Sequence, residues 1–170
     1  CSPSRRPASN SRFMAVLACW FQSVIRVGST EVHHFWDQGV LSHEPQVLGP
    51  AAHVWTRTTF RPADVDVAEL YDGFSFNALS WIESLGFCEI GEAKDFLDGG
   101  QNIARDGLLP LNTHGGQLSH GRTHGMGLVH EAVTQLRGQG AERQVADAAT
   151  AIVTSGGLTP GSVLLLRRDP

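Results

Sequence analysis

The chain has 170 residues, of which 41% are hydrophobic and 18% charged, and its formal net charge is −4 at pH 7. This length and composition are typical of one globular domain with a sizeable core. The acidic balance and the dispersed basic residues argue against nucleic-acid binding, and no apolar run reaches the roughly 20 residues of a membrane-crossing helix.

The cysteines and the N-terminal segment indicate the setting of the protein. Cys1, Cys19 and Cys88 are odd in number and lack the spacing of a zinc site, so a reducing, cytoplasmic location is expected. The apolar run 13–21 behind several arginines imitates a secretion signal but is short for one. Because the first residue is not methionine, the chain is interpreted as a fragment. Cys88 has no neighbouring base and is expected to be inert.

The first half of the chain predicts a short series of elements. Residues 2–10 are expected to be disordered, residues 13–27 to form a strand or a short helix, and residues 33–45 to form a loop. Helical spacing predicts a helix over 47–58, with Pro50 in its first turn. A strand is predicted over 65–70. A helix then follows Gly73, with Phe74, Leu79, Ile82 and Leu85 on its apolar face, and stops at Gly86.

The second half adds a short helix over 93–97, a brief strand over 108–111, and a helix that ends near Gly138. The apolar face of that last helix is predicted from Met126, Val129, Val133 and Leu136. Two segments rich in Val, Ile and Leu, 150–154 and 162–166, flank a Gly/Pro turn and predict a β-hairpin. The order of elements is that of an α/β layer.

A glycine- and histidine-rich stretch, residues 112–127, precedes the last helix. It holds five glycines and three histidines, and glycine at that density lets the backbone approach a ligand closely. No metal site is expected, because the spacings of His114, His120, His124 and His130 match no zinc pattern. We expect at least one of the first three to line a pocket and His130 to be structural.

Tyr71 is the single tyrosine and follows a predicted strand, where ligands collect in α/β sheets. A phenol acts most readily as a proton donor, or as an acceptor where cations stabilise the phenolate. A core residue with a satisfied hydroxyl is an equal alternative. Ser155 lacks the GxSxG setting of a hydrolase serine, and with Gly156 and Gly157 it offers backbone N–H groups to an anion instead.

Three blocks together resemble the C-terminal half of the thiolase superfamily, nearest to the sterol-carrier or lipid-transfer type and its steroid side-chain aldolases. Tyr71-Asp72-Gly73-Phe74 stands where thiolases place Asn-Glu-Ala-Phe. Residues 112–122 stand at the Asn-x-x-Gly-Gly…Gly-His-Pro loop, and residues 155–157 at the Cys-x-Gly-Gly turn. The resemblance implies a thiolase-like α/β C-terminal domain over residues 46–170, with a mixed sheet flanked by helices and the N-terminal half missing. Residues 1–45 match poorly and are expected to be disordered or non-native.

The resemblance also implies altered chemistry. The acid/base cysteine of condensing thiolases is Ser155 here, their loop histidine is Arg122, and the asparagine of their first motif is Tyr71. Serine is too weak an acid to replace a thiol and arginine stays protonated, so Claisen condensation is not expected. Retro-aldol cleavage of a β-hydroxyacyl-CoA thioester needs only one acid/base group and an oxyanion hole.

By resemblance to the aldolases, Tyr71 would be the acid/base, with Arg122 or a loop histidine favouring its phenolate. The enolate oxygen would be held by His124 and the backbone of Gly156 and Gly157. The remaining substrate-binding residues would be Asn112, Gly115, Gly116 and Ser155. The substrate would be a coenzyme A thioester, with no cofactor or metal, and the partner a small OB-fold/zinc-ribbon protein in a homo- or hetero-oligomer. The alternatives are an acyltransferase-type thiolase fragment and a non-catalytic acyl-CoA- or lipid-binding subunit.

Overall fold

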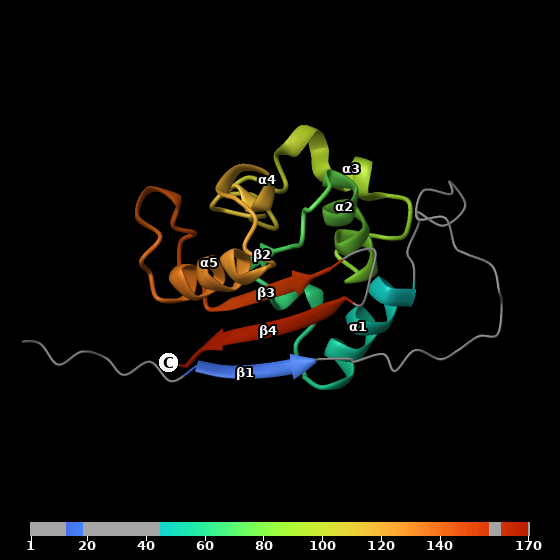
Figure 1. The fold of residues 1–170 in the computed structure, drawn as a ribbon, viewed down its shortest axis with the longest axis horizontal. Coiled ribbons are helices and arrows are strands. Elements are labelled where there is room, and N and C mark those ends of the chain that lie inside the picture. Colours follow the sequence, from blue (N-terminus) through green and yellow to red (C-terminus); the bar gives the residue numbers. More distant parts are fainter. Residues whose placement is uncertain (1–12, 19–44, 157–160, 170) are drawn as a thin grey trace, which may run out of the picture.

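The computed structural model describes the backbone of residues 13–18 and 45–50, and all atoms of residues 51–156 and 161–169. Its centre is a mixed sheet with the strand order β1-β4-β3-β2 (Figure 1). The strands are β1 (Phe13–Ala18), β2 (Val67–Glu69), β3 (Thr150–Ser155) and β4 (Ser162–Arg168). β4 is antiparallel to both of its neighbours, whereas β2 runs parallel to β3. The predicted α/β class with a mixed sheet is confirmed.

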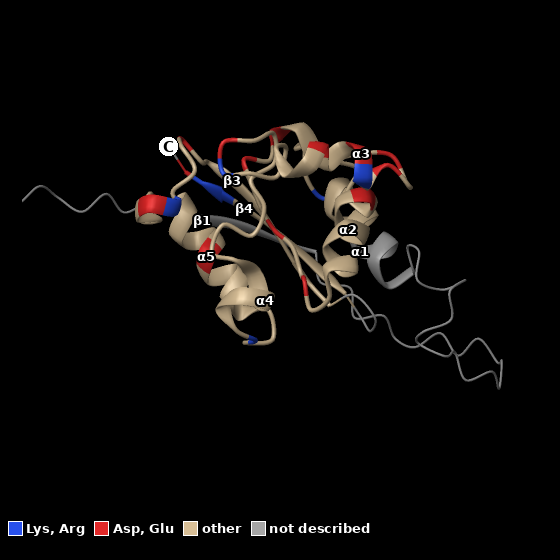
Figure 2. Cartoon of the chain, turned by 90° about the horizontal axis from the view of Figure 1, so that it is seen from above, with Lys and Arg blue, Asp and Glu red and all other residues tan. Residues whose placement is uncertain are grey.

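Helices cover both faces of this sheet (Figure 2). One face packs on α1 (Pro45–Thr56) and α2 (Ser75–Ser84), and the other on α5 (Met126–Leu136). The alternation of side chains along β3 explains the two layers, since Ile152 belongs to the core under α1 and α2 while Ala151 and Val153 belong to the core under α5. The β3–β4 pairing, with Ser155 opposite Ser162, confirms the predicted hairpin.

Shorter elements connect these layers. They are η1 (Pro62–Asp64), α3 (Ala93–Leu97), η2 (Asp98–Gly100), α4 (Gly116–His120) and η3 (Ala141–Arg143). The predicted helix over 93–97 is confirmed, whereas α4, inside the glycine-rich stretch, was not predicted. None of the described helices is long and apolar enough to cross a membrane.

Three predictions about these elements are wrong in detail. The residues expected to form a strand over 108–111 make only an isolated parallel bridge between Leu111 and Ala68, because Leu109 and Leu111 donate their N–H groups within their own loop. Pro50 is the sixth residue of α1 rather than part of its first turn, since the helix already begins at Pro45. Phe74 precedes α2 and its side chain is 51% exposed, so it is not part of the core.

The buried face of α5 also differs from the prediction. Met126 is 64% exposed, whereas Leu128, Ala132 and Leu136 are fully buried, so the buried stripe is rotated around the helix from the predicted one. The reason lies in two polar residues, Glu131 and Gln135, which are buried on the inner face and which apolar periodicity does not count.

Most of the N-terminal segment lies outside the described residues. Within 1–45 the structure describes the backbone of β1 and of Pro45, and β1 pairs with β4 along its whole length. The strand predicted in 13–27 is confirmed over Phe13–Ala18. The expectations for residues 2–10 and 33–44, and for Cys1 and Cys19, concern residues outside the described ranges.

Candidate active site

The side chain of Asn112 joins the end of β2 to the glycine-rich stretch, because it makes the pair of backbone hydrogen bonds that a neighbouring strand would make. Asn112 Oδ1 accepts the N–H of Leu70 at 2.7 Å, and Asn112 Nδ2 donates to the Leu70 carbonyl at 3.0 Å. Both polar atoms of the Asn112 amide are therefore used by the fold. A substrate contact by this amide stays a prediction, and it would have to share these bonds.

A buried acid, Glu69, strengthens the same junction. Its side chain is fully buried, and Oε1 accepts the N–H of Thr113 at 3.1 Å and lies 2.9 Å from Thr113 Oγ1. Its Oε2 lies 3.1 Å from Nδ1 of His114, whose side chain is only 5% exposed. Burial raises the pKa of Glu69, against the opposing effects of His114 and Thr113. Burial lowers the pKa of His114, but the contact with Glu69 and its charge outweigh this, and the net direction is upward. The two side chains thus lie within ion-pair distance of each other, although their contact does not have hydrogen-bond geometry.

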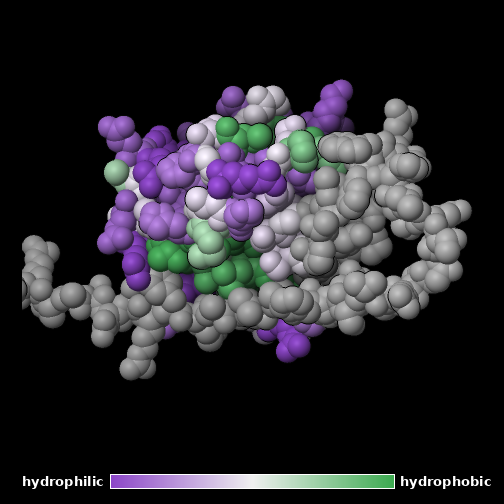
Figure 3. Space-filling model, in the orientation of Figure 1, coloured by the Kyte–Doolittle hydropathy of each residue, from purple (hydrophilic) through white to green (hydrophobic). Residues whose placement is uncertain are grey.

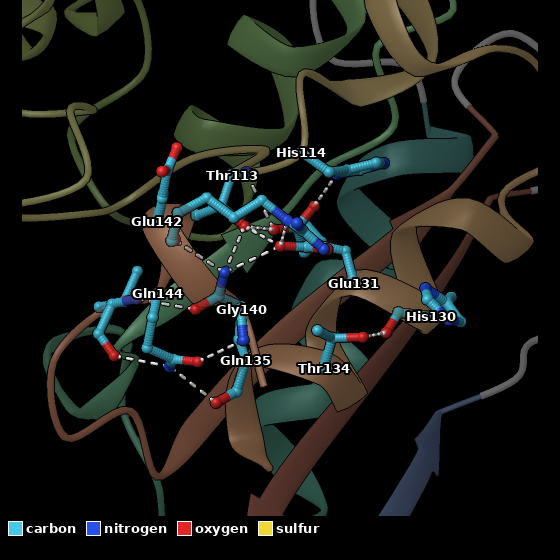
Figure 4. A network of polar contacts seen from close by, with 12 residues as sticks. Thr113, His114, His130, Glu131, Thr134, Gln135, Gly140, Glu142 and Gln144 are labelled. Carbon is cyan, nitrogen blue, oxygen red and sulfur yellow. Dashed lines mark hydrogen bonds and ion pairs between the residues drawn. The ribbon is translucent and has the colours of Figure 1, made fainter. Parts of the chain in front are cut away.

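The junction continues to α5 through one hydroxyl (Figure 4). Thr113 Oγ1 lies 2.7 Å from Glu131 Oε1, and Glu131 is held by Arg143 through two contacts, Nε–Oε1 at 2.9 Å and Nη2–Oε2 at 3.0 Å. Gln135 also donates to Thr113 and Glu131. Burial raises the pKa of Glu131, but hydrogen bonds from Arg143, Gln135 and Thr113 outweigh it and lower the pKa overall.

The hydrogens in this network can be counted. Thr113 has one hydroxyl hydrogen but two carboxylate neighbours, so it donates to only one of them at a time. The bidentate pair with Arg143 keeps Glu131 ionised. The Thr113 hydroxyl also lies closer to Glu131 Oε1, at 2.7 Å, than to Glu69 Oε1, at 2.9 Å, so it donates to Glu131. The positive charge of a protonated His114 beside Glu69 would offset the repulsion between the two acids. We call Glu69, Thr113, His114 and Glu131, together with the exposed Arg143 that pairs with Glu131, the buried polar network.

Tyr71 follows directly after this junction. Its backbone N–H donates to Thr154 Oγ1 at 2.8 Å, which ties the strand end to β3. Its half-buried ring packs against both cores, and its hydroxyl lies 3.4 Å from Arg122 Nη2. The structure thus places two of the predicted catalytic residues side by side. The alternative of a core tyrosine with a satisfied hydroxyl stays open, because the ring packs against both cores and the hydroxyl has a partner in Arg122, which is an exposed loop residue.

Asp72 and Gly116 fix the next turn. Asp72 is buried, and its Oδ1 accepts the N–H of Gln117 at 2.8 Å. A Cβ on Gly116 would lie 1.9 Å from Asp72 Oδ2, and Gly116 has a φ of +64°. Gly115 precedes α4 at a φ of +96°. Both glycines are thus required by the loop itself, and contact with a substrate stays a prediction for them.

Two of the other predicted residues, His124 and Ser155, line a cavity of about 240 Å³. Its lining comes from the start of α5 and from the facing ends of β3 and β4: His124, Gly125, Met126, Val129, Val153, Thr154, Ser155, Ser162, Val163 and Leu164. Hydrophobic surface gathers over these three elements (Figure 3). The expectation that a loop histidine lines a pocket is confirmed by His124, which stands at the cavity with Ser155.

The turn after Ser155 is only partly described. The Gly156 carbonyl accepts the indole N–H of Trp81 at 2.8 Å, so this oxygen points into the fold. Gly157 lies outside the described residues, and its predicted role stays a prediction. Within the described part of the chain, no three His, Cys, Asp or Glu side chains form a group that could hold a metal ion. Burial, with the nearby charges of Glu83, Glu92 and Glu89, raises the pKa of the Cys88 thiol to about 11, which suits an inert cysteine.

Sequence reasoning missed Glu69, Glu131 and Arg143. Glu69 had a visible signal, since it is an acid inside an apolar strand and such an acid needs a partner. The partners themselves could not be identified from the sequence, because Thr113 lies 44 residues from Glu69 and 18 residues from Glu131.

The comparisons with known proteins agree with this geometry. Residues 47–166 match the family model described as thiolase C-terminal domain-like. The chain belongs to the thiolase family. It is 46% identical over 113 residues to a 17-hydroxy-3-oxo-4-pregnene-20-carboxyl-CoA lyase of Mycobacterium tuberculosis, a match that covers 66% of this chain and 29% of the lyase.

Two further thiolase-type relatives support the assignment. A steroid side-chain-cleaving aldolase of Thermomonospora curvata is 42% identical over 116 residues, which cover 68% of this chain and 29% of the aldolase. A solved structure named Ltp2-ChsH2(DUF35) aldolase superposes with a TM-score of 0.74 at 34% identity, covering 91% of this chain and 38% of that one. The chain therefore spans less than a third of the length of the two curated relatives, and these matches show its family and fold.

Proposed function

We propose that this thiolase-fold chain is the C-terminal part of an enzyme that cleaves a β-hydroxyacyl-CoA thioester by a retro-aldol reaction. The observation that carries the proposal is the placement of the Tyr71 hydroxyl, half-buried at the end of β2 and 3.4 Å from the guanidinium of Arg122. A phenol beside a permanent cation can hold and release a proton. The relatives named as a lyase and an aldolase support the same reaction class.

The reaction follows from the groups available. Tyr71, in its phenolate form, takes the proton of the β-hydroxyl, the C–O bond becomes a carbonyl, and the Cα–Cβ bond breaks. The electron pair of that bond forms the enolate of the thioester. The proton now on the Tyr71 hydroxyl is returned to the α-carbon of the enolate, which gives the shortened acyl-CoA and regenerates the phenolate. This step needs a proton carrier and donors for the enolate oxygen, but no covalent nucleophile.

The cavity supports an apolar substrate group. Six of the residues that line it carry apolar side chains or none, while the other four, His124, Thr154, Ser155 and Ser162, carry hydrogen-bonding groups. Such a cavity favours a hydrocarbon chain or ring with one polar end. The substrate would then be a coenzyme A thioester of lipid or steroid type, with no further cofactor.

The partner and the location belong to the same proposal. The similar solved aldolase is named for two components, Ltp2 and ChsH2, of which the second is marked DUF35. We expect a hetero-oligomer with a small OB-fold/zinc-ribbon protein, since the resemblance to aldolases implies one. A coenzyme A substrate and three cysteines without disulfide spacing support a cytoplasmic location.

The test uses the chain within its complete gene product, co-expressed with the small OB-fold/zinc-ribbon protein that we expect as its partner. The substrate is a 17-hydroxy-3-oxo-steroid with a 20-carboxyl-CoA side chain, and the expected products are the 17-ketone and propionyl-CoA. Tyr71→Phe should lower kcat by about 10² to 10⁴, the usual contribution of a proton carrier. Tight binding of the thioester without turnover would instead identify a binding subunit, and full activity of Tyr71→Phe would overturn the role of the phenol.

A further inference from the structure

The phenol of Tyr71 lies over the backbone of Gly73. A Cβ on Gly73 would stand 2.6 Å from Tyr71 Cε1, 2.7 Å from its hydroxyl oxygen and 2.8 Å from Cζ. All three separations are shorter than any contact that two such atoms accept. The ring and its hydroxyl therefore occupy the space that any other residue at position 73 would fill with its side chain.

The backbone of Gly73 gives no other reason for a glycine. Its φ lies outside the left-handed region, unlike that of Gly115, Gly116 or Gly125. An alanine would therefore be accepted here by the main chain, and only the Tyr71 ring excludes it.

The backbone on both sides of Gly73 is held in place. The Asp72 side chain accepts the N–H of Gln117 at 2.8 Å, and the Phe74 N–H donates to Asn77 Oδ1 at 3.1 Å. The N–H of Tyr71 is bonded to Thr154. A side chain at position 73 could not be relieved by moving this turn without breaking such bonds, so the ring would have to rotate.

We propose that Gly73 is a positioning residue for the Tyr71 hydroxyl: its missing Cβ lets the phenol fold over the turn and reach Arg122. Rotation of the ring would take the hydroxyl away from Arg122 Nη2, to which it is already at the outer limit of hydrogen-bond distance. The steric part of this inference needs no assumption about function. Its catalytic part rests on the proposed aldol cleavage.

A double-mutant cycle in folding stability tests the steric part. The four proteins are the wild type, Gly73→Ala, Tyr71→Ala and the double variant, unfolded by urea. Gly73→Ala should lower the folding equilibrium constant at least about tenfold when the ring is present, and leave it unchanged or raise it when the ring is absent. An equal loss in both backgrounds overturns the inference. So does a double variant that fails to fold while Tyr71→Ala folds.

A spectroscopic measurement follows the phenol itself. Because Tyr71 is the single tyrosine of the chain, incorporation of 3-fluorotyrosine gives signals from one ring. Gly73→Ala should displace this ¹⁹F signal, whereas the matched control Ser75→Ala, a one-atom change at the exposed first residue of α2, should leave it in place. An unmoved signal in Gly73→Ala contradicts the inference.

Turnover then tests the catalytic part. In the assembled enzyme, Gly73→Ala should lower kcat nearly as far as Tyr71→Phe with KM within about twofold, and the two changes together should cost little more than either alone. A Gly73→Ala enzyme with wild-type kcat overturns the positioning role. If Tyr71→Phe keeps full activity while the stability cycle succeeds, the proposed function fails and the steric inference stands.

Discussion

Two regions that meet at Tyr71 differ in how their polar groups are used. On one side, the buried polar network and Asn112 join β2, the glycine-rich stretch and α5 through hydrogen bonds inside the fold, and Glu69 Oε2 and His114 Nδ1 lie within ion-pair distance without a hydrogen bond. On the other side, Arg122 and His124 are exposed and Ser155 lies at the cavity. The comparison shows that one glycine- and histidine-rich stretch holds both a structural junction and the open edge of a site.

Among the substitutions that test this comparison, the largest loss of stability is expected at Gly116. Gly116→Ala places a methyl group 1.9 Å from Asp72 Oδ2 at a φ of +64°, and should lower the free energy of unfolding by about 3–4 kcal/mol. Urea unfolding of the chain measures this loss. Gly99→Ala is the matched control, because Gly99 has the same φ of +64° with no atom within 4 Å. It should lose only about 1 kcal/mol, and an equal loss in both variants would contradict the steric argument.

A somewhat smaller loss is expected at Glu69. Glu69→Ala removes the acceptor of the Thr113 N–H and the carboxylate that faces the Thr113 hydroxyl and the buried His114 side chain, so the free energy of unfolding should fall by about 2–3 kcal/mol. Glu69→Gln keeps an oxygen acceptor and the volume, and should lose clearly less. If chemical denaturation gives both variants the same stability, the contacts of the Glu69 carboxylate with Thr113 and His114 do not stabilise this junction.

The pH dependence of the free energy of unfolding should report the titration of Glu69 and His114. The folded pKa of His114 is raised, so its contribution is fully present below the unfolded pKa of about 6.5 and is lost as pH rises through the folded pKa. The raised pKa of Glu69 acts in the same direction, but from its unfolded pKa of about 4.5 upward. The free energy of unfolding should therefore begin to fall above about pH 4.5 through Glu69 and fall further above about pH 6.5 through His114.

The control for this pH effect is a neighbouring histidine. His114→Asn should remove most of the fall, whereas His120→Asn should keep it, because His120 is exposed and only its ring edge contacts His114, at 5.1 Å between centroids. Urea titrations at several pH values measure both. A wild-type protein that gains stability over this pH range would contradict the upward direction of the two pKa values.

The sequence predicts most of the elements because their signals are local. Helical spacing, glycine stops and runs of branched residues need only a few neighbouring positions, and they place Tyr71 correctly at the end of β2. The junction could not be predicted in this way. Its contacts join β2 to residues more than 40 positions away, and its buried acids look like surface residues in a hydropathy pattern. The same acids explain why the buried face of α5 was assigned incorrectly.

The smallest effect on stability, and the sharpest separation of the two regions, is expected at Arg122. Its guanidinium makes a contact of 3.4 Å with the Tyr71 hydroxyl from an exposed loop, so Arg122→Gln should change the free energy of unfolding by no more than about 0.5 kcal/mol. In the assembled enzyme the same change should lower kcat by about tenfold or more, because the developing phenolate loses a permanent positive charge. Arg122→Lys should recover part of this loss, since it returns the charge without the planar group. An Arg122→Gln enzyme with wild-type kcat would mean that the open edge helps the phenol in some other way, and a large loss of stability would mean that Arg122 belongs to the structural junction.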